Sequence, residues 1–244
     1  MLSSIKACEI DPLVDQGTTN STTSSSVDVS YESAPKVRRS GHRSSLIIFD
    51  WDDTILPTSY LSKLGYKLDS PSPVASVQAV LDEYSLFANR TLTEAAKRGH
   101  VMIVTNAETG WIQLTVEKFM PKSVEIVKRF EHISARSMFE PTGILSPIGW
   151  KESAFKMVVQ EYIRAVSKKC QVISLGDSAH EREAVLKVCQ EYKEHIVCKS
   201  LKFMERPDID SLKKEHQLIQ DCLIDILTHN DHLDLCIQAS TNLT

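Results

Sequence analysis

The sequence predicts an α/β fold in which helices cover both faces of a parallel sheet. Two observations predict it. Short apolar segments rich in β-branched residues alternate along the chain with longer segments whose apolar residues recur at helical spacing. Polar and acidic residues follow several of the apolar segments directly, as expected where a crevice opens at the carboxyl ends of parallel strands. The alternation also implies right-handed crossovers between the strands.

Five segments are expected to form the strands. The first is the run SLIIF at residues 45–49, which is almost entirely apolar, as expected for a strand that is covered on both faces. The others are residues 100–105, 131–135, 170–175 and 195–201, of which 131–135 has the weakest pattern.

Helices are expected between and after these strands. They span residues 72–99, 110–120, a short stretch from Pro121, 149–169, 179–193 and 208–227. Ser72 and Pro73 are expected to open the first helix, as its cap and first-turn proline, and Gly99 to end it. Trp111 and Trp150 fall at helix starts and are expected only to pack. The segment HLDLCI at residues 232–237 is expected to cover a sheet edge or a helix face.

The chain divides into two parts. Residues 1–44 contain the Ser/Thr tract GTTNSTTSSSVDVS, which is too polar to bury a core and is expected to be disordered. The basic cluster KVRRSGHRSS that ends this tail is interpreted as a solvated linker, with a phosphorylated tail or an import signal as alternatives. Residues 45–244 are expected to form one domain with a helical extension at its carboxyl end.

The composition excludes several classes of protein. The chain of 244 residues has a formal net charge of −4, which argues against bulk nucleic-acid binding. No apolar run approaches the roughly 18 residues that span a membrane, and no hydrophobic signal core is seen at the amino terminus. A cytoplasmic location is therefore expected, with the nucleus as the alternative. The six cysteines, none in a Cys-x-x-Cys pair, are expected to be reduced thiols.

Four groups of polar residues follow strands or open a helix. They are DWDDT at residues 50–54, Thr105 with Asn106, the lysine Lys151, and GDSAHE at residues 176–181. Each is weak evidence alone, because acids and Gly-Asp pairs are common in loops. Their joint placement at the predicted carboxyl edge of the sheet indicates a site.

These groups resemble motifs I to IV of the haloacid dehalogenase (HAD) superfamily, in the right order. The resemblance rests on DWDDT, VTNAE, Lys151 and LGDSAHE and covers residues 46–201. It implies a three-layer Rossmann-like fold and an Mg²⁺-dependent phosphohydrolase that acts through an aspartyl-phosphate. Retention of the second aspartate of motif I, Asp52, argues against the dehalogenase branch, which lacks this acid and the metal.

The resemblance assigns the chemistry to Asp50 and Asp52. Asp50 is implied to be the nucleophile that forms the aspartyl-phosphate. Residues two apart on an extended segment point to the same side, so Asp52 can flank the same phosphoryl group while Trp51 turns away. Asp52 is then the general acid and base, which requires a raised pKa that Asp50, Asp53 and partial burial can supply.

The resemblance also implies the ligands of a magnesium ion. They are the Asp50 carboxylate, the Asp52 backbone carbonyl and Asp177, with Glu181 as a further acid that acts through water. Glu183 is a less favoured substitute for Glu181. Oxygen atoms of this kind are the ligands that Mg²⁺ prefers, and the ion offsets the charge of the clustered acids.

Three more residues are implied to serve the phosphate. Thr105 and Lys151 would hold its oxygens, and Asn106 would position Thr105 or the flap. Two positions depart from the family pattern. Asp53 stands where glycine is frequent, and Glu181 replaces the more usual aspartate.

Loop lengths indicate that the site has no cap domain. In this superfamily a cap is inserted either after motif I or before motif III, and here residues 57–72 and 136–149 are too few for one. An open site favours a bulky phosphorylated substrate such as a phosphoprotein. The alternatives are a HAD-like scaffold that binds protein with little catalysis, and a small-metabolite phosphatase whose lid comes from a partner.

Overall fold

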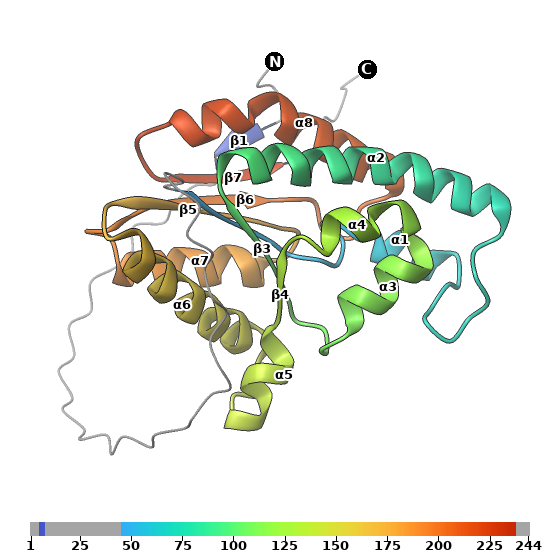
Figure 1. Cartoon of the computed structure of the whole chain (residues 1–244), viewed down its shortest axis with the longest axis horizontal. Coiled ribbons are helices and arrows are strands. Elements are labelled where there is room, and N and C mark those ends of the chain that lie inside the picture. Colours follow the sequence, from blue (N-terminus) through green and yellow to red (C-terminus); the bar gives the residue numbers. More distant parts are fainter. Residues whose placement is uncertain (1–4, 8–44, 238–244) are drawn as a thin grey trace.

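The computed structural model describes residues 5–7 and 45–237. These residues contain a seven-stranded sheet in the order β1-β7-β6-β5-β2-β3-β4 (Figure 1). The strands are β1 (Ile5–Ala7), β2 (Ser45–Phe49), β3 (His100–Thr105), β4 (Glu131–Ser134), β5 (Cys170–Gly176), β6 (Ile196–Lys202) and β7 (Leu233–Ile237). Strands β2 to β7 are all parallel, and β1 pairs antiparallel with β7. The predicted α/β fold with a parallel sheet is confirmed.

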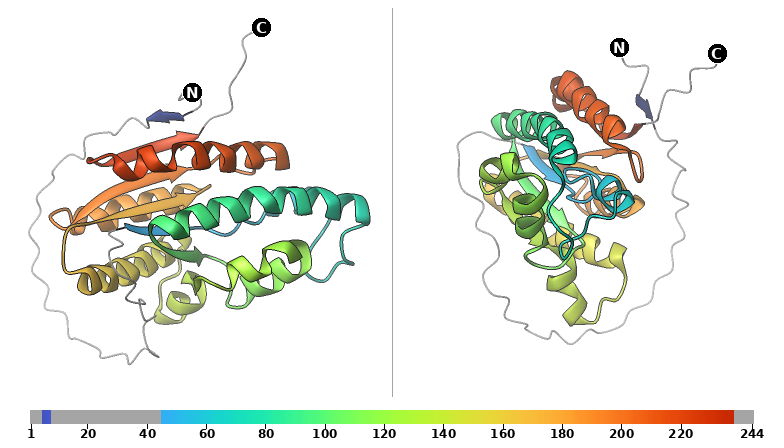
Figure 2. Two further views of the ribbon diagram at one scale, coloured as in Figure 1. Left: turned by 45° about the horizontal axis from the view of Figure 1, so that its top comes forward. Right: turned by 90° about the vertical axis from the view of Figure 1, so that its right-hand side faces the viewer.

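Helices cover both faces of this sheet, as the views in Figures 1 and 2 show. On one face lie α1 (Thr58–Lys63), α2 (Ala75–Arg98), α3 (Trp111–Phe119), α4 (Val124–Val127) and α8 (Ile209–Thr228). On the other lie α5 (Ala135–Phe139), α6 (Pro147–Val166) and α7 (Ala179–Glu191). Short 3₁₀ turns at Pro121–Ser123 and Glu140–Thr142 follow α3 and α5.

Strand residues alternate between two apolar clusters, one beneath each helical layer. Ile47 and Phe49 of β2 belong to the cluster under α2 and α8, whereas Leu46 and Ile48 belong to the cluster under α6 and α7. This alternation is the period of two expected for a strand, and it buries β2 completely. Because β2 lies between β5 and β3, the residue that follows it, Asp50, leaves from the middle of the sheet.

The strand order reverses beside β2, which places the crevice of the fold. The chain runs from β2 outward to β3 and β4, and then returns to β5 on the other side of β2. The adjacent carboxyl ends of β2 and β5 are therefore the switch point, where open α/β sheets bind their ligands. Asp50 is held there by its backbone N–H, which donates to the carbonyl of Leu175 at 2.8 Å.

The last crossover has the opposite hand to the others. The β5–α7–β6 and β6–α8–β7 connections move in the same direction across the sheet, yet α7 and α8 lie on opposite faces. Right-handed connections make up about 98% of such units, so β6–α8–β7 is the left-handed one. The expectation of right-handed crossovers throughout is wrong here. Helix α8 lies beside α2, where buried His216 is hydrogen-bonded to Tyr84 Oη at 3.0 Å.

The carboxyl-terminal segment adds a strand that the sequence did not predict. Residues 233–237 form β7, which pairs parallel with β6. Asp234 accepts hydrogen bonds from Arg182 of α7 through both carboxylate oxygens, each at 3.0 Å from Nε, and this ties the strand to the helical layer. The expectation that HLDLCI covers a sheet edge is therefore met by a strand that extends the sheet.

Two other expectations concern the amino-terminal tail and the cysteines. Residues 5–7, within the tail that is expected to be disordered, form strand β1, and the rest of that tail lies outside the described residues. Four cysteines, Cys170, Cys189, Cys198 and Cys222, are free thiols as expected. Cys236 is disulfide-bonded, which contradicts the expectation for this residue.

The helix boundaries differ slightly from those predicted. Helix α2 begins at Ala75 after Val74, so neither Ser72 nor Pro73 lies in it. Helix α6 begins two residues earlier than predicted, where Ser146 caps the backbone N–H of Gly149 and proline occupies the first turn. Residues 57–74 hold only α1 and a loop, and residues 135–146 hold only α5 and a 3₁₀ turn.

Candidate functional site

The carboxyl ends of three neighbouring strands and the start of α6 meet at the switch point. Asp50 follows β2, Thr105 ends β3, and Asp177 follows β5. Lys151 lies in the second turn of α6, a helix on the face of the sheet that α5 and α7 also cover. Parallel strands place their carboxyl ends at one edge, so residues more than a hundred positions apart come into contact there.

Lys151 joins the first and last motifs. Its Nζ lies 2.5 Å from Asp50 Oδ1 and 2.9 Å from Glu181 Oε1, and it donates a hydrogen bond of 2.6 Å to the carbonyl of Val104. The side chain is fully buried, so these three oxygens replace water around the ammonium group. The ammonium group thus uses all three of its N–H donors, two of them on carboxylates.

The same place gathers three carboxyl groups. Asp50, Asp177 and Glu181 each offer one oxygen, and these oxygens lie within 4.8 Å of one another. Among the described residues, ion pairs join this cluster only to the Lys151 ammonium, so the cluster is short of positive charge when all three acids are ionised. Three oxygen ligands with a deficit of positive charge could hold a metal cation.

Burial and pairing set the charge on these groups. Burial raises the pKa of Asp50 well above its ordinary value, against the opposing effect of Lys151 and with help from the neighbouring acids. Burial also acts to raise the pKa of Glu181, but Lys151 and a hydrogen bond from Ser178 outweigh it, so that pKa is lowered. Burial acts to lower the pKa of Lys151, and the two carboxylates reverse this and raise it. Lys151 therefore stays charged.

The pKa of Asp177 is raised as well. Burial, the nearby Glu181 carboxylate and Asp53 raise its pKa to about 7. At neutral pH such a carboxyl group is only partly ionised. A bound cation would lower its pKa and restore the ionised form.

Helix α7 fixes Glu181 at the site through its own start. Ser178 caps the helix, and its backbone N–H donates to Glu181 Oε2 at 3.1 Å, which completes a capping box. The Ser178 hydroxyl donates to the same oxygen. Glu181 Oε1 remains free to face Lys151, so this one side chain serves both the helix and the site.

The Asp52 carboxylate is surrounded by donors. Thr58 Oγ1 donates to Oδ1 at 2.6 Å, and the Trp111 indole Nε1 lies 3.0 Å from Oδ1 and 3.1 Å from Oδ2. Thr105 Oγ1 lies 3.4 Å from Oδ2. Burial raises the pKa of Asp52, opposed by the hydrogen bonds from Thr58 and Trp111 and assisted by the charge of Asp53. The net rise agrees in direction with the pKa expected for a general acid.

Asp53 has a structural task at the start of α1. Its φ is 52°, in the left-handed region that aspartate tolerates better than most side chains. Its two carboxylate oxygens accept from the backbone N–H and the hydroxyl of Ser59, at 2.7 and 2.6 Å. Asp53 thus holds the first turn of α1, and its carboxylate turns to that helix.

Two of the predicted residues, Asn106 and Glu183, lie apart from the cluster of acids. Asn106 donates from Nδ2 to the carbonyl of Pro147 at 3.1 Å, so it joins the loop after β3 to the start of α6. Thr105, its neighbour, accepts from the backbone N–H of Ala107 at 3.0 Å. Glu183 is exposed on α7 and belongs to no cluster of possible metal ligands among the described residues.

Sequence reasoning missed Thr58 and Trp111. Thr58 was correctly placed in the short segment at residues 57–72, and Trp111 was correctly placed at a helix start. Their contact with Asp52 was not foreseen. A hydroxyl or an indole in a helical first turn is common, and nothing in the spacing says which side chain it meets. Their positions just after the motif I strand and the motif II strand are the signal that could have found them.

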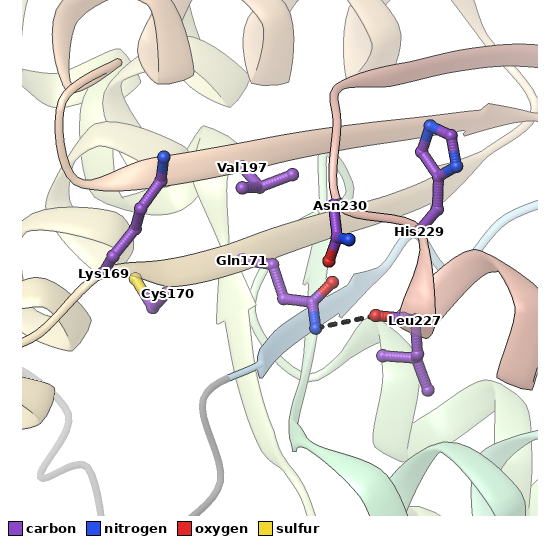
Figure 3. Close-up of a pocket in the computed structure, with 7 residues that line it drawn as sticks. All are labelled: Lys169, Cys170, Gln171, Val197, Leu227, His229 and Asn230. Atoms are coloured by element: carbon purple, nitrogen blue, oxygen red, sulfur yellow. Dashed lines mark hydrogen bonds between the residues drawn. The ribbon is translucent and has the colours of Figure 1, made fainter.

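A separate hollow lies at the opposite edge of the sheet (Figure 3). It has a volume of about 160 Å³ and is lined by Lys169, Cys170, Gln171, Val197, Leu227, His229 and Asn230. Gln171 Nε2 donates to the carbonyl of Leu227 at 3.1 Å across it. The hollow lies at the amino ends of β5 and β6, contains none of the predicted site residues, and is a feature of the fold rather than of the site.

The comparisons with known proteins give no relative. The chain matches no protein-family model, no curated protein and no solved structure. Among the described residues, no helix has the length and apolar character to cross a membrane.

Proposed function

We propose that this protein is a capless member of the HAD superfamily and an Mg²⁺-dependent phosphohydrolase that forms an aspartyl-phosphate. One observation carries the proposal: Lys151 Nζ lies within 3 Å of both Asp50 and Glu181, while Asp177 completes the cluster of carboxylates. The proposed nucleophile, an ammonium group and a set of hard ligands therefore lie together at the switch point of the sheet.

In the first step Asp50 attacks phosphorus. An oxygen of its carboxylate forms a bond to phosphorus while the ester bond to the leaving oxygen breaks. Asp52 gives its proton to that leaving oxygen, so an alcohol departs and Asp52 becomes a carboxylate. Lys151 and the Thr105 hydroxyl face the phosphoryl oxygens, and the Lys151 charge stabilises them as the transition state forms.

In the second step water removes the phosphoryl group from Asp50. The water oxygen forms a bond to phosphorus and gives a proton to the Asp52 carboxylate, and the bond between phosphorus and Asp50 breaks. Inorganic phosphate leaves, Asp50 is again a carboxylate, and Asp52 again carries its proton. Both steps are balanced, and the same residue acts first as an acid and then as a base.

The residues present fit a magnesium ion. The carboxylates of Asp50 and Asp177 would hold it with the backbone carbonyl of Asp52, and Glu181 would support it through water. When bound, such an ion supplies positive charge to the phosphoryl oxygens and keeps the clustered acids ionised.

The proposed substrate is a phosphoprotein or another bulky phosphate ester. Only α1 with its loop and α5 with its 3₁₀ turn stand where a cap domain would be inserted. No closed chamber is thus built over the acids by the described chain. A phosphoserine peptide should therefore have a higher kcat/KM than free phosphoserine, and equal values would contradict this part of the proposal.

The test of the proposal is phosphate release from an aryl phosphate. Wild-type protein with MgCl₂ should release phosphate, and Asp50→Asn should lower kcat by about a thousandfold or more. Glu183→Gln is the matched control, because it removes an acid from the same helix as Glu181 but from an exposed position. No turnover by a folded wild-type protein on several esters would refute the proposal.

A protein-binding scaffold is the second candidate function. It is favoured by the fact that Lys151 already pairs with Asp50 and Glu181, so the pocket is partly neutralised without a ligand. A scaffold would bind its partner equally well in the wild type and in Asp50→Asn, with and without Mg²⁺, and would release no phosphate.

A further inference from the structure

We propose that Trp111 is a positioning residue that orients the Asp52 carboxyl group toward the phosphate ester. This inference rests on the proposed phosphohydrolase function. Its basis is the indole Nε1 of Trp111, which lies at nearly equal distances, 3.0 and 3.1 Å, from the two oxygens of Asp52. A donor that bridges both carboxylate oxygens fixes the direction in which the carboxyl group points, and together with the Thr58 hydroxyl on Oδ1 it limits rotation of the carboxyl plane.

The two oxygens of Asp52 differ in the partners that they have. Oδ1 accepts the short hydrogen bond from Thr58 at 2.6 Å in addition to the contact with Trp111. Oδ2 has only Trp111 and the longer contact of 3.4 Å with Thr105. Because Thr105 is proposed to face the phosphoryl group, Oδ2 is the oxygen directed to the ester and the one that exchanges the proton.

Trp111 is itself held in place relative to motif I. Its helix α3 begins directly after Gly110, whose φ of 91° turns the chain sharply at that point. The Thr115 hydroxyl donates to the Trp111 carbonyl at 2.6 Å and accepts from the Trp51 indole at 3.0 Å. Helix α3 is therefore joined to motif I at two points, through Trp51 and through Asp52.

The hydrogen bond is separable from the packing of the ring. Trp111→Phe keeps an aromatic ring against the apolar cluster but removes the indole N–H. Thr58 still holds Oδ1, so Asp52 stays near its place, but its carboxyl group can swing about that single short hydrogen bond. Proton delivery to the leaving oxygen depends on this orientation, whereas phosphate binding does not.

The first test compares two leaving groups. Phenyl phosphate has a poor leaving group that needs a proton, and 4-nitrophenyl phosphate has a good one that needs it much less. In Trp111→Phe we expect kcat for phenyl phosphate to fall by about tenfold or more, with KM unchanged and the 4-nitrophenyl reaction changed by less than about threefold. Trp150→Phe, which removes an indole bonded to the Ile144 carbonyl, should leave the ratio of the two rates unchanged.

The second test detects the contact without turnover. The chain has three tryptophans, so an amide correlation spectrum of ¹⁵N-labelled protein has three indole signals. Trp111→Phe identifies the signal of residue 111. Asp52→Ala should shift that signal, whereas the signals of Trp51 and Trp150, which donate to Thr115 and Ile144, should move little.

The outcomes separate this inference from the proposed function. Wild-type turnover together with an equal loss for both esters in Trp111→Phe, or with no loss for either, overturns the positioning role and leaves the phosphohydrolase intact. The positioning role is also overturned if Asp52→Ala leaves the position of the residue 111 indole signal unchanged. A wild-type protein that hydrolyses neither ester overturns both proposals together.

Discussion

Gly176 shows at the scale of one residue how the fold and the site constrain each other. A Cβ atom added there would lie 2.5 Å from Cγ of Glu181 and 2.8 Å from its Cβ. The glycine is needed for space. It is not needed for its backbone freedom, because Gly176 does not have a positive φ. The close approach lets Glu181 reach back over the end of β5 to Lys151, so the Gly-Asp pair of the sequence motif has a steric cause.

Gly176→Ala should therefore displace Glu181. We expect a loss of about 1 to 3 kcal/mol in the free energy of unfolding, typical of overpacking in a dense region. Urea denaturation measures it. In a Glu181→Ala background, which removes Cγ, the same substitution should cost clearly less. Equal costs in the two backgrounds would show that the clash with Cγ of Glu181 is not the cause.

Glu215 and His216 give a pH dependence with opposite signs. Burial raises the pKa of Glu215 to about 8 from 4.5, so the folded protein keeps a proton that the unfolded chain has lost. Stability then falls as pH rises between these values, by at most about 1.4 kcal/mol per pH unit. Burial lowers the pKa of His216 to about 4 from 6.5, so its contribution is lost as pH falls through that range.

Glu215→Gln should remove the first of these effects. The amide oxygen still accepts from the backbone N–H of Met204, which Glu215 Oε1 does at 2.6 Å. The variant should gain stability relative to the wild type as pH rises from 5 to 8.5, as measured by urea denaturation at several pH values. A difference between the two proteins that is constant with pH would contradict the raised pKa.

The candidate site was predictable as far as its chemistry follows strand ends. Asp50, Asp177 and Lys151 could be placed together because parallel strands share a carboxyl edge. The partners of Asp52 could not, since the direction of Trp111 depends on the start of α3 and on Thr115. The role of Asp53 as an anchor of α1 was also beyond the pattern, because it requires the left-handed backbone that turns its side chain to Ser59.

At the scale of elements, the end of α8 depends on a buried cation. Lys199 of β6 is fully buried, and its Nζ donates to the carbonyls of Ile226 and His229, the latter at 2.8 Å, and to Gln171 Oε1 at 2.7 Å. Burial lowers its pKa to about 8, which leaves the group largely charged at neutral pH. The ammonium thus satisfies carbonyls at the negative end of the helix dipole.

Lys199→Met should loosen the end of α8. The carbonyls lose their donor without a substitute, and we expect a loss of about 1 to 3 kcal/mol in the free energy of unfolding. Hydrogen exchange should speed up at residues 224–229 and in β7. Lys187→Met, an exposed lysine of α7, is the control and should change stability by less than about 0.5 kcal/mol. Unchanged exchange at the end of α8 would refute the capping role.

The elements themselves were predictable where burial is two-sided or a helical stripe is long. Strand β2 was found at its predicted residues, and helix α6 was found with ends off by two to three residues. Strand β7 was not, because its five residues include Asp234 and therefore lack the continuous apolar run of a strand such as β2. The left hand of the β6–α8–β7 crossover is set by the packing of α8 on α2, through contacts such as His216 with Tyr84 that no local pattern reveals.

At the scale of the whole molecule, the charge of the site couples metal binding to stability. Three acids face one ammonium group, so a cation that binds only the folded protein should stabilise it by mass action. With MgCl₂ at 100 times the dissociation constant, we expect a gain of about 2.7 kcal/mol and a higher Tm. Asp177→Asn should abolish this gain.

The measurement is thermal unfolding in MgCl₂ against NaCl of equal ionic strength. Without the metal, Asp177→Asn should not lower Tm and is expected to raise it, because it removes a buried carboxyl group whose pKa is raised to about 7. Equal effects of the two salts on the wild-type protein would show that the acids hold no specific cation.

Asp52 and Asp53 are consecutive, and so are the hydroxyl residues that they bind, Thr58 and Ser59. The first turn of α1 is therefore moored by two adjacent carboxylates, of which one is the proposed proton carrier. If Asp52 rotates away from Thr58, one of these two hydrogen bonds is lost and only the bonds of Ser59 to Asp53 hold the turn. A change in the orientation of Asp52 is therefore transmitted directly to the short helix α1.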